Sequence, residues 1–246
     1  MSNKLKFLIG AVVLSTQWAI PPTASAVGNG IPFVFRELFV PSVAHPVPAD
    51  SMDFTYHSCA NFIDQDSFVE QGYLWISSFQ DDAGVVDSQI NDYLPNGYHL
   101  YARYAYGADQ WMGAQPTPNG ARLNYIVNGG NIGLYSDPMS DTVLSLQGCA
   151  VVAMGTADDK FLGFAGAIID GQKSETNDLA NGDFEIVFAN WVFTGDGQLL
   201  FRDPNNPNNN PLVAQILSFN GNVTLLGGPL GQDHKPEGSG NLYWID

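Results

Sequence analysis

The chain has few basic residues, few cysteines and no long apolar run after its first thirty residues. Nine lysines and arginines stand against 25 aspartates and glutamates, so the formal net charge is −16 at pH 7. That charge repels the phosphate backbone of nucleic acids and anionic lipid surfaces. The longest later apolar run, Phe161 to Ile169, is interrupted by two glycines, whereas a membrane-spanning helix needs about 20 apolar residues. We therefore expect no nucleic-acid partner and no transmembrane segment.

Cysteine is limited to two residues, Cys59 and Cys149. Neither lies in a Cys-x-x-Cys pair, so the pattern does not support redox catalysis. In an oxidising compartment an even pair predicts a disulfide, with two buried free thiols as the alternative. In the chain-entropy account, closing a loop of about 90 residues stabilises a fold by roughly 4–5 kcal/mol.

The first 26 residues have the pattern of a secretory signal peptide. Lys4 and Lys6 precede an apolar stretch from Phe7 to Leu14, and Ala24-Ser25-Ala26 offers a small-residue cleavage site. A buried N-terminal helix is the alternative interpretation. We expect cleavage after Ala26 and a secreted chain of residues 27–246 that folds as one domain, in surroundings that are oxidising and rich in calcium.

Alternation with a period of two dominates the rest of the chain. Asp53–Cys59, Tyr73–Phe79 and His99–Tyr106 alternate aromatic or aliphatic residues with smaller or polar ones. Turn pairs such as Asn96-Gly97 and Asn220-Gly221 punctuate these runs. The pattern predicts an all-β fold with little helix, either a jelly-roll-like antiparallel β-sandwich, which we favour, or a related barrel. Only residues 85–94 show a weak helical pattern.

Sequence signatures of catalysis are absent. There is no Gly-x-Ser-x-Gly elbow, no His-Glu-x-x-His helix and no phosphate-binding glycine loop. The four histidines, His45, His57, His99 and His234, lie far apart in the sequence. We therefore expect a protein that is not an enzyme. A hydrolase with two carboxyl groups at one cleft remains an alternative, because 25 acidic residues could supply such a pair.

Acidic residues in turn-like stretches are candidates for holding calcium, which prefers carboxylate and carbonyl oxygens. None of these stretches completes a calcium-binding loop, so the ion is possible and no cofactor is required. The weak metal-binding candidates are Asp64, Asp66, Asp81, Asp82, Asp158, Asp159 and Asp196.

Aromatic residues suggest a second kind of contact, the stacking of side-chain rings on sugar rings. Most aromatic residues of an all-β fold belong to the core, so only a few are candidates. Trp111 lies in a polar stretch and is the best single candidate for an exposed contact, with Tyr104 and Tyr106 beside it in the list of binding residues. The wider set of rings comprises Trp75, Tyr101, Tyr104, Tyr106, Trp111, Trp191 and Trp244.

Five stretches of the chain together resemble the flocculation-associated PEP-CTERM proteins of floc-forming bacteria. The similarity covers most of residues 30–220. One difference is the end of the chain, Gly240-Asn241-Leu242-Tyr243-Trp244-Ile245-Asp246, which lacks the Pro-Glu-Pro, hydrophobic and basic sorting tail. The matching stretches are Ser67–Tyr73, Tyr98–Tyr104, Leu134–Pro138 with Thr142, Gly182–Ile186 and Thr194–Pro204.

The resemblance implies an exported, β-rich, non-catalytic protein associated with exopolysaccharide and cell aggregation, and it implies no catalytic residues. We therefore expect a matrix or adhesion protein, active in biofilm or flocculation, that contacts extracellular polysaccharide or other cell-surface material. Without the sorting tail, free secretion is favoured, although the periplasm or cell surface is also open. Besides the hydrolase, the alternatives are a self-assembling surface or filament subunit, whose edge strands would pair, and an outer-membrane barrel, which polar residues on both faces of several strands disfavour.

Overall fold

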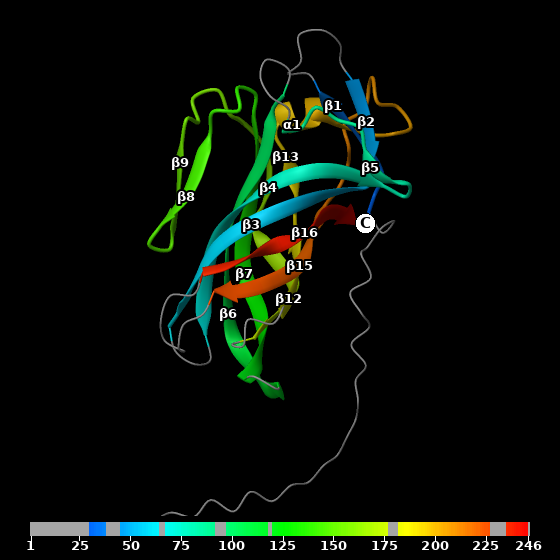
Figure 1. The fold of residues 1–246 in the computed structure, drawn as a ribbon. Helices are drawn as coiled ribbons and strands as arrows, with labels where there is room; N and C mark the ends of the chain where they lie inside the picture. Colours follow the sequence, from blue (N-terminus) through cyan, green and yellow to red (C-terminus); the bar gives the residue numbers. More distant parts are fainter. Residues whose placement is uncertain are drawn as a thin grey trace, which may run out of the picture.

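The computed structural model describes residues 30–37, 45–63, 67–91, 97–117, 120–176, 182–226 and 235–245. The predicted signal segment, residues 1–26, and the metal candidates Asp64 and Asp66 lie outside the described residues. Within them, every pairing between strands β1 to β16 is antiparallel, and the one helix, α1 (Gly195–Leu200), has six residues. The prediction of an all-β fold with little helix is confirmed (Figure 1).

Eight strands form a closed barrel, which corrects the prediction of a sandwich. Each strand pairs with the next one of the eight along the chain, and the last returns to the first. Alternating residues fit a sandwich and a barrel equally well, because both bury one face of each strand. The strands are β3 (Ser51–Phe62), β4 (Phe68–Asp81), β6 (His99–Thr117), β7 (Gly120–Asp137), β11 (Ala167–Thr176), β12 (Gly182–Ala189), β15 (Ile216–Leu226) and β16 (Lys235–Ile245).

Aromatic and aliphatic side chains fill the barrel. The ring of Phe219 lies at the centre of this packing, with ring centroids 5.0 Å from Phe54, 5.0 Å from Tyr104 and 4.7 Å from Phe184. Gly72 makes room for Tyr104, because a Cβ atom at position 72 would lie 2.6 Å from the tyrosine ring. Close packing of this kind, and the area it removes from water, is the main source of stability in such a core.

One end of the barrel is covered by a small sheet and the helix. The sheet consists of β2 (His45–Ala49), β1 (Phe33–Glu37) and β14 (Phe201–Arg202), and Figure 1 shows it gathered with α1 at that end. The side chain of Thr194 caps α1 by accepting a hydrogen bond from the backbone N–H of Gly197. Buried rings join the cover to the barrel, among them Phe33, Phe35, Phe79, Phe201 and Trp244.

The remaining strands lie outside the eight-stranded ring. β5 (Gly84–Val86) extends the sheet beside β4, so the weak helical pattern over residues 85–94 was wrong where the chain is described. β10 (Lys160–Ala165) pairs with one half of β7 and with β13 (Val192–Phe193). β8 (Val143–Gln147) and β9 (Ala150–Met154) form a hairpin of their own beside the barrel (Figure 1).

A disulfide fastens this hairpin to the barrel. Cys149 lies in the turn between β8 and β9, and Cys59 lies in β3; their Cα atoms are 4.9 Å apart. The predicted pairing is confirmed. In the described part of the chain, no helix has the length and apolar character needed to cross a membrane.

Candidate functional site

The outer wall of the barrel carries a row of aromatic rings beside the hairpin. Trp75, Tyr101, Tyr135 and Phe161 occupy directly opposed positions on the neighbouring strands β4, β6, β7 and β10. Opposed residues on one face of a sheet are in contact distance. Consecutive ring centroids are 5.4, 5.0 and 5.0 Å apart, and the two tyrosine rings are nearly parallel at 9°.

The hairpin covers only part of this row. Leu144 and Leu146 of β8, with Val151 and Ala153 of β9, pack on the barrel over Tyr101 and its neighbours, so Tyr101 is buried. On the opposite face of the hairpin, the side chains are exposed. Beyond the hairpin, the rings of Phe161 and Phe164 remain exposed, at 38% and 44% of their surface.

Between the hairpin and β10 the wall is hollowed into a cleft of about 550 Å³. A second hollow of about 250 Å³ shares three of its lining residues and adds Tyr101, Thr156 and Asp159. We call the two hollows together the aromatic cleft. Clefts of 300–1,000 Å³ with aromatic walls and a few polar groups are typical of binding sites for small molecules. The side chains that matter below are Gln71, Arg103, Asn131, Tyr135, Val151, Phe161 and Phe164.

The cleft lies where strand β7 changes partners. Residues 132–136 of β7 pair with β10, and residues 122–126 pair with β11, so the stretch between them has no strand partner on that side. Gly133 adds to the depression, because a Cβ atom there would lie 3.2 Å from the Phe161 ring and 3.4 Å from the Tyr135 ring. The hollow therefore follows from the strand register and from a missing side chain.

Arg103 projects from β6 into this cleft. Its guanidinium carbon lies 5.2 Å from the centroid of the Tyr135 ring, a distance at which a cation is attracted to the ring face. Tyr73 and Gly133 stand opposite Arg103 on the two neighbouring strands. The side chain is exposed, and it has no ion pair and no hydrogen bond with another described residue.

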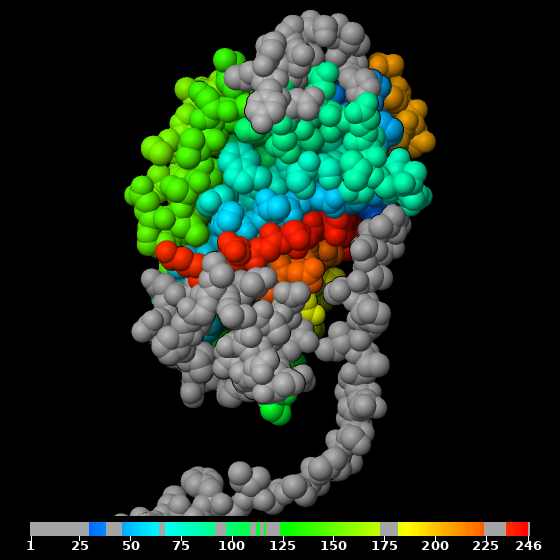
Figure 2. Space-filling view, viewed as in Figure 1, coloured from blue at the N-terminus to red at the C-terminus, as the bar shows by residue number. Residues whose placement is uncertain are grey.

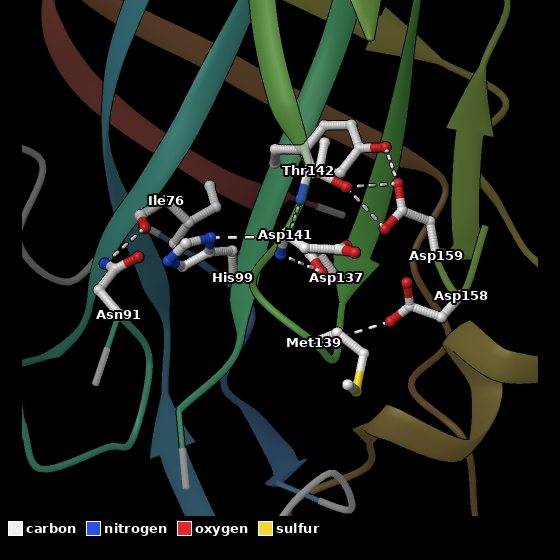
Figure 3. Close-up of polar contacts among 10 residues, drawn as sticks. Ile76, Asn91, His99, Asp137, Met139, Asp141, Thr142, Asp158 and Asp159 are labelled. Carbon is white, nitrogen blue, oxygen red and sulfur yellow. Dashed lines mark hydrogen bonds and ion pairs between the residues drawn. The ribbon is translucent and has the colours of Figure 1, made fainter. Parts of the chain in front are cut away.

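Asp159 closes the smaller hollow of the cleft. Its carboxylate accepts hydrogen bonds from the hydroxyl groups of Tyr101, at 2.5 Å, and Thr142, at 2.9 Å. Burial raises the pKa of Asp159 above its ordinary value, while these two hydrogen bonds act in the opposite direction. Burial, together with the hydrogen bond to Asp159, also raises the pKa of Tyr101. The contact therefore joins the root of the hairpin to the barrel wall (Figure 3).

Three carboxylates beside this contact are the described residues that could hold a metal ion. Asp137, Asp141 and Asp158 bring ligand oxygens within 4.8 Å of one another. Figure 3 shows them around the start of the hairpin, where Asp137 accepts a hydrogen bond from the backbone N–H of Thr142 at 2.9 Å. His99 Nδ1 lies 3.6 Å from the same carboxylate. The chain itself therefore already occupies part of the bonding capacity of Asp137.

The other metal candidates do not join this group. Asp81 accepts a hydrogen bond from the backbone N–H of Ala83 in the turn after β4, and Asp82 lies in the same turn. Asp196 is exposed in the first turn of α1. Among the described candidates, only Asp158 belongs to the carboxylate group, because strand order and not sequence proximity brings it to Asp137.

The predicted sugar-stacking residues are placed differently from expectation. Tyr104 and Tyr106 are each 3% exposed and belong to the barrel core, so they form no exposed platform. Period-two alternation points them inward with Phe54 and Phe219 on other strands. Trp111 pairs with Tyr125 in β6, but its side chain lies outside what the structure describes.

Sequence reasoning missed four residues of the cleft: Arg103, Tyr135, Phe161 and Phe164. Arg103 and Tyr135 could have been found, because each alternates with core residues and so faces outward on its strand. Phe161 and Phe164 are three residues apart and could not share a face by strict alternation. A register shift between Phe161 and Gly163 brings both to the outer face.

The lining of the aromatic cleft includes one carboxylate, that of Asp159. Glycoside hydrolysis of the common kinds needs two carboxyl groups about 5–10 Å apart across the substrate. The cleft therefore does not supply the acid pair on which the hydrolase alternative depends. Comparison with family models, with curated proteins and with solved structures finds no match for the chain.

Proposed function

We propose that the protein is an exported, non-catalytic matrix or adhesion component that binds polysaccharide in the aromatic cleft. The observation that carries the proposal is the exposure of Phe161 and Phe164, next to the ring of Tyr135, in a hollow that also holds hydrogen-bonding side chains. Most rings of a β-barrel are buried, so a row that continues from the core onto an open wall needs a reason.

Sugar rings match this combination of surfaces. A pyranose presents a flat C–H face, which packs on an aromatic ring, and a rim of hydroxyl groups, which need donors and acceptors. Gln71 and Asn131 supply amide groups at the cleft, and Arg103 supplies N–H donors. Apolar walls with a few placed polar groups give both affinity and orientation.

The cleft is supported by a scaffold that needs no rearrangement. Its wall on the hairpin side is fastened by the disulfide at the tip and by the Asp159 and Asp137 contacts at the root. A site that is ordered before binding loses less conformational entropy when the ligand arrives. Binding alone, without an activated group, is enough for a matrix role.

Export is supported by three features that agree with one another. A disulfide persists in oxidising compartments outside the cytoplasm. The first 26 residues have the signal pattern, and the large negative charge favours solubility at high concentration. The resemblance to flocculation-associated proteins adds the expectation that the bound material is exopolysaccharide.

The proposal is tested by retention on insoluble polysaccharide. Mature protein, residues 27–246, is compared with the variants Phe164→Ser and Tyr135→Ser, and with the control Val213→Ser. Val213 is 78% exposed and lies outside the cleft lining, so its change removes exposed apolar surface without touching the site. Loss of about 1.4 kcal/mol of ring contact corresponds to a tenfold weaker affinity.

We expect retention to fall in both cleft variants and to persist in the control. Cells that lack the protein should also aggregate less, and the wild-type chain should restore aggregation while Tyr135→Ser should not. Equal retention of all four proteins, or no retention of the wild type on any polysaccharide, would show that the cleft has another role.

A further inference from the structure

We infer that the aromatic cleft selects acidic sugars, with Arg103 pairing with the carboxylate of a uronic acid unit. This inference rests on the proposed function and adds the chemical class of the ligand. Its first support is the charge of the lining: Arg103 is the only charged residue around the larger hollow. In a chain with 25 acidic and nine basic residues, a hollow with one cation and no acid is a local region of positive potential.

The second support is the bonding state of the guanidinium. Arg202 shows how this fold uses an arginine for structure: it is 6% exposed, and it donates hydrogen bonds to the carbonyl oxygens of Pro207, at 2.9 Å, and Gln198, at 2.8 Å. Arg103 has no such partner among the described residues; its contact is the face of Tyr135. Stacking on a ring restrains the guanidinium and leaves its N–H donors for a ligand.

The third support is the match between this arrangement and one kind of sugar. A guanidinium forms two parallel hydrogen bonds with a carboxylate, and these charge-assisted bonds are stronger than neutral ones. A uronic acid carries its carboxylate at the rim of the pyranose ring, so the ring can pack on Phe161 or Phe164 while the carboxylate reaches Arg103. Neutral sugars use the same rings but leave the cation unpaired.

The rest of the protein limits how acidic the polysaccharide should be. Asp159 stands in the smaller hollow, next to the position of Arg103, and the remaining surface is strongly negative. Charges more than about 8 Å away are screened at physiological salt, so a single carboxylate at Arg103 is tolerated. A chain with a carboxylate on every sugar would place further charges near Asp159. We therefore expect the preferred ligand to alternate acidic with neutral units.

The test compares three soluble probes of equal length: a neutral oligosaccharide, the same backbone with alternating uronic acid units, and one with sulfate esters in place of carboxylates. Binding is measured by calorimetry for the mature wild type, Arg103→Gln, Arg103→Lys and Lys160→Gln. Lys160 is an exposed residue of β10 outside the cleft lining, so Lys160→Gln removes the same charge nearby without changing the site. Unchanged melting curves verify that each variant is folded.

We expect the wild type to bind the uronic acid probe about tenfold more tightly than the neutral one, a modest value for a charge-assisted hydrogen-bonded pair. Arg103→Gln should abolish this preference and leave neutral binding unchanged, Arg103→Lys should keep part of it, and Lys160→Gln should keep all of it. Equal binding of the neutral and uronic acid probes by the wild type overturns the inference and leaves the proposed function standing. Preference for the sulfated probe overturns the carboxylate assignment, and absence of binding to every probe overturns the proposed function as well.

Discussion

Removal of the disulfide should destabilise the whole barrel and not only the hairpin that it fastens. The double variant Cys59→Ala/Cys149→Ala opens a loop whose ends are 90 residues apart in the sequence. The loop includes strands β4, β6 and β7, half of which would gain freedom only in the unfolded chain. In the chain-entropy account, the free energy of unfolding falls by about 4–5 kcal/mol for a loop of this size.

This magnitude can be measured in two independent ways. For a chain of this length, each kcal/mol lowers the melting temperature by about 2–4 °C, so we expect a fall of about 10–20 °C. With a urea slope of roughly 2–3 kcal/mol per molar, the unfolding midpoint should fall by about 2 M. Circular dichroism reports the barrel, and tryptophan fluorescence reports the packing around Trp75 near the hairpin.

The control for changes on the hairpin itself is Val143→Ser, whose side chain is 53% exposed on the outer face of β8. It should leave the unfolding free energy nearly unchanged. If the double variant loses less than about 1 kcal/mol, the loop-entropy reasoning is wrong for this protein. If fluorescence changes at a lower urea concentration than circular dichroism, the hairpin detaches first and the disulfide acts locally.

Three further predictions concern the root of the hairpin, the floor of the cleft and the core. Asp137→Ala removes an acceptor of buried backbone N–H groups and should lower the unfolding free energy by about 1–3 kcal/mol in urea titrations. Gly133→Val fills the cleft and should weaken retention on polysaccharide severalfold, with little change in melting temperature, because its new atoms meet movable side chains. Burial raises the pKa of Tyr104 and Tyr106 well above 10, so the fold favours their neutral form. Their contribution to stability should be complete below pH 10 and be lost as the pH rises further, and a phenolate absorbance titration should show these tyrosines ionising only as the protein unfolds.

Much of the strand content could be predicted from the sequence, because each strand buries one face. Residues 53–59, 73–79 and 99–106 alternate and lie in β3, β4 and β6. The closure of these strands into a barrel could not be predicted in the same way. Closure depends on pairing between β16 and β3, which are nearly 180 residues apart in the sequence, as the partners His57 and Glu237 show, and no local pattern encodes that pairing.

The candidate site was less predictable than the fold, for a reason that individual residues make clear. Tyr104 and Arg103 are neighbours in one alternating strand, and the period indicates that they face opposite ways without indicating which face is the core. The bulge that turns both Phe161 and Phe164 outward leaves no mark in the residue types. The disulfide was predictable, since the chain offers a single possible pair.

The ring of eight strands has a consequence for how copies of this protein meet. Because each barrel strand has a partner on both sides for much of its length, few backbone donors and acceptors of the barrel wall are left for another molecule. Unsatisfied edges are found on short strands such as β2 and the two strands of the hairpin, five residues each. Crowded copies could therefore exchange strands only through these short segments, and any polymer they form should depend on side-chain contacts that dilution reverses.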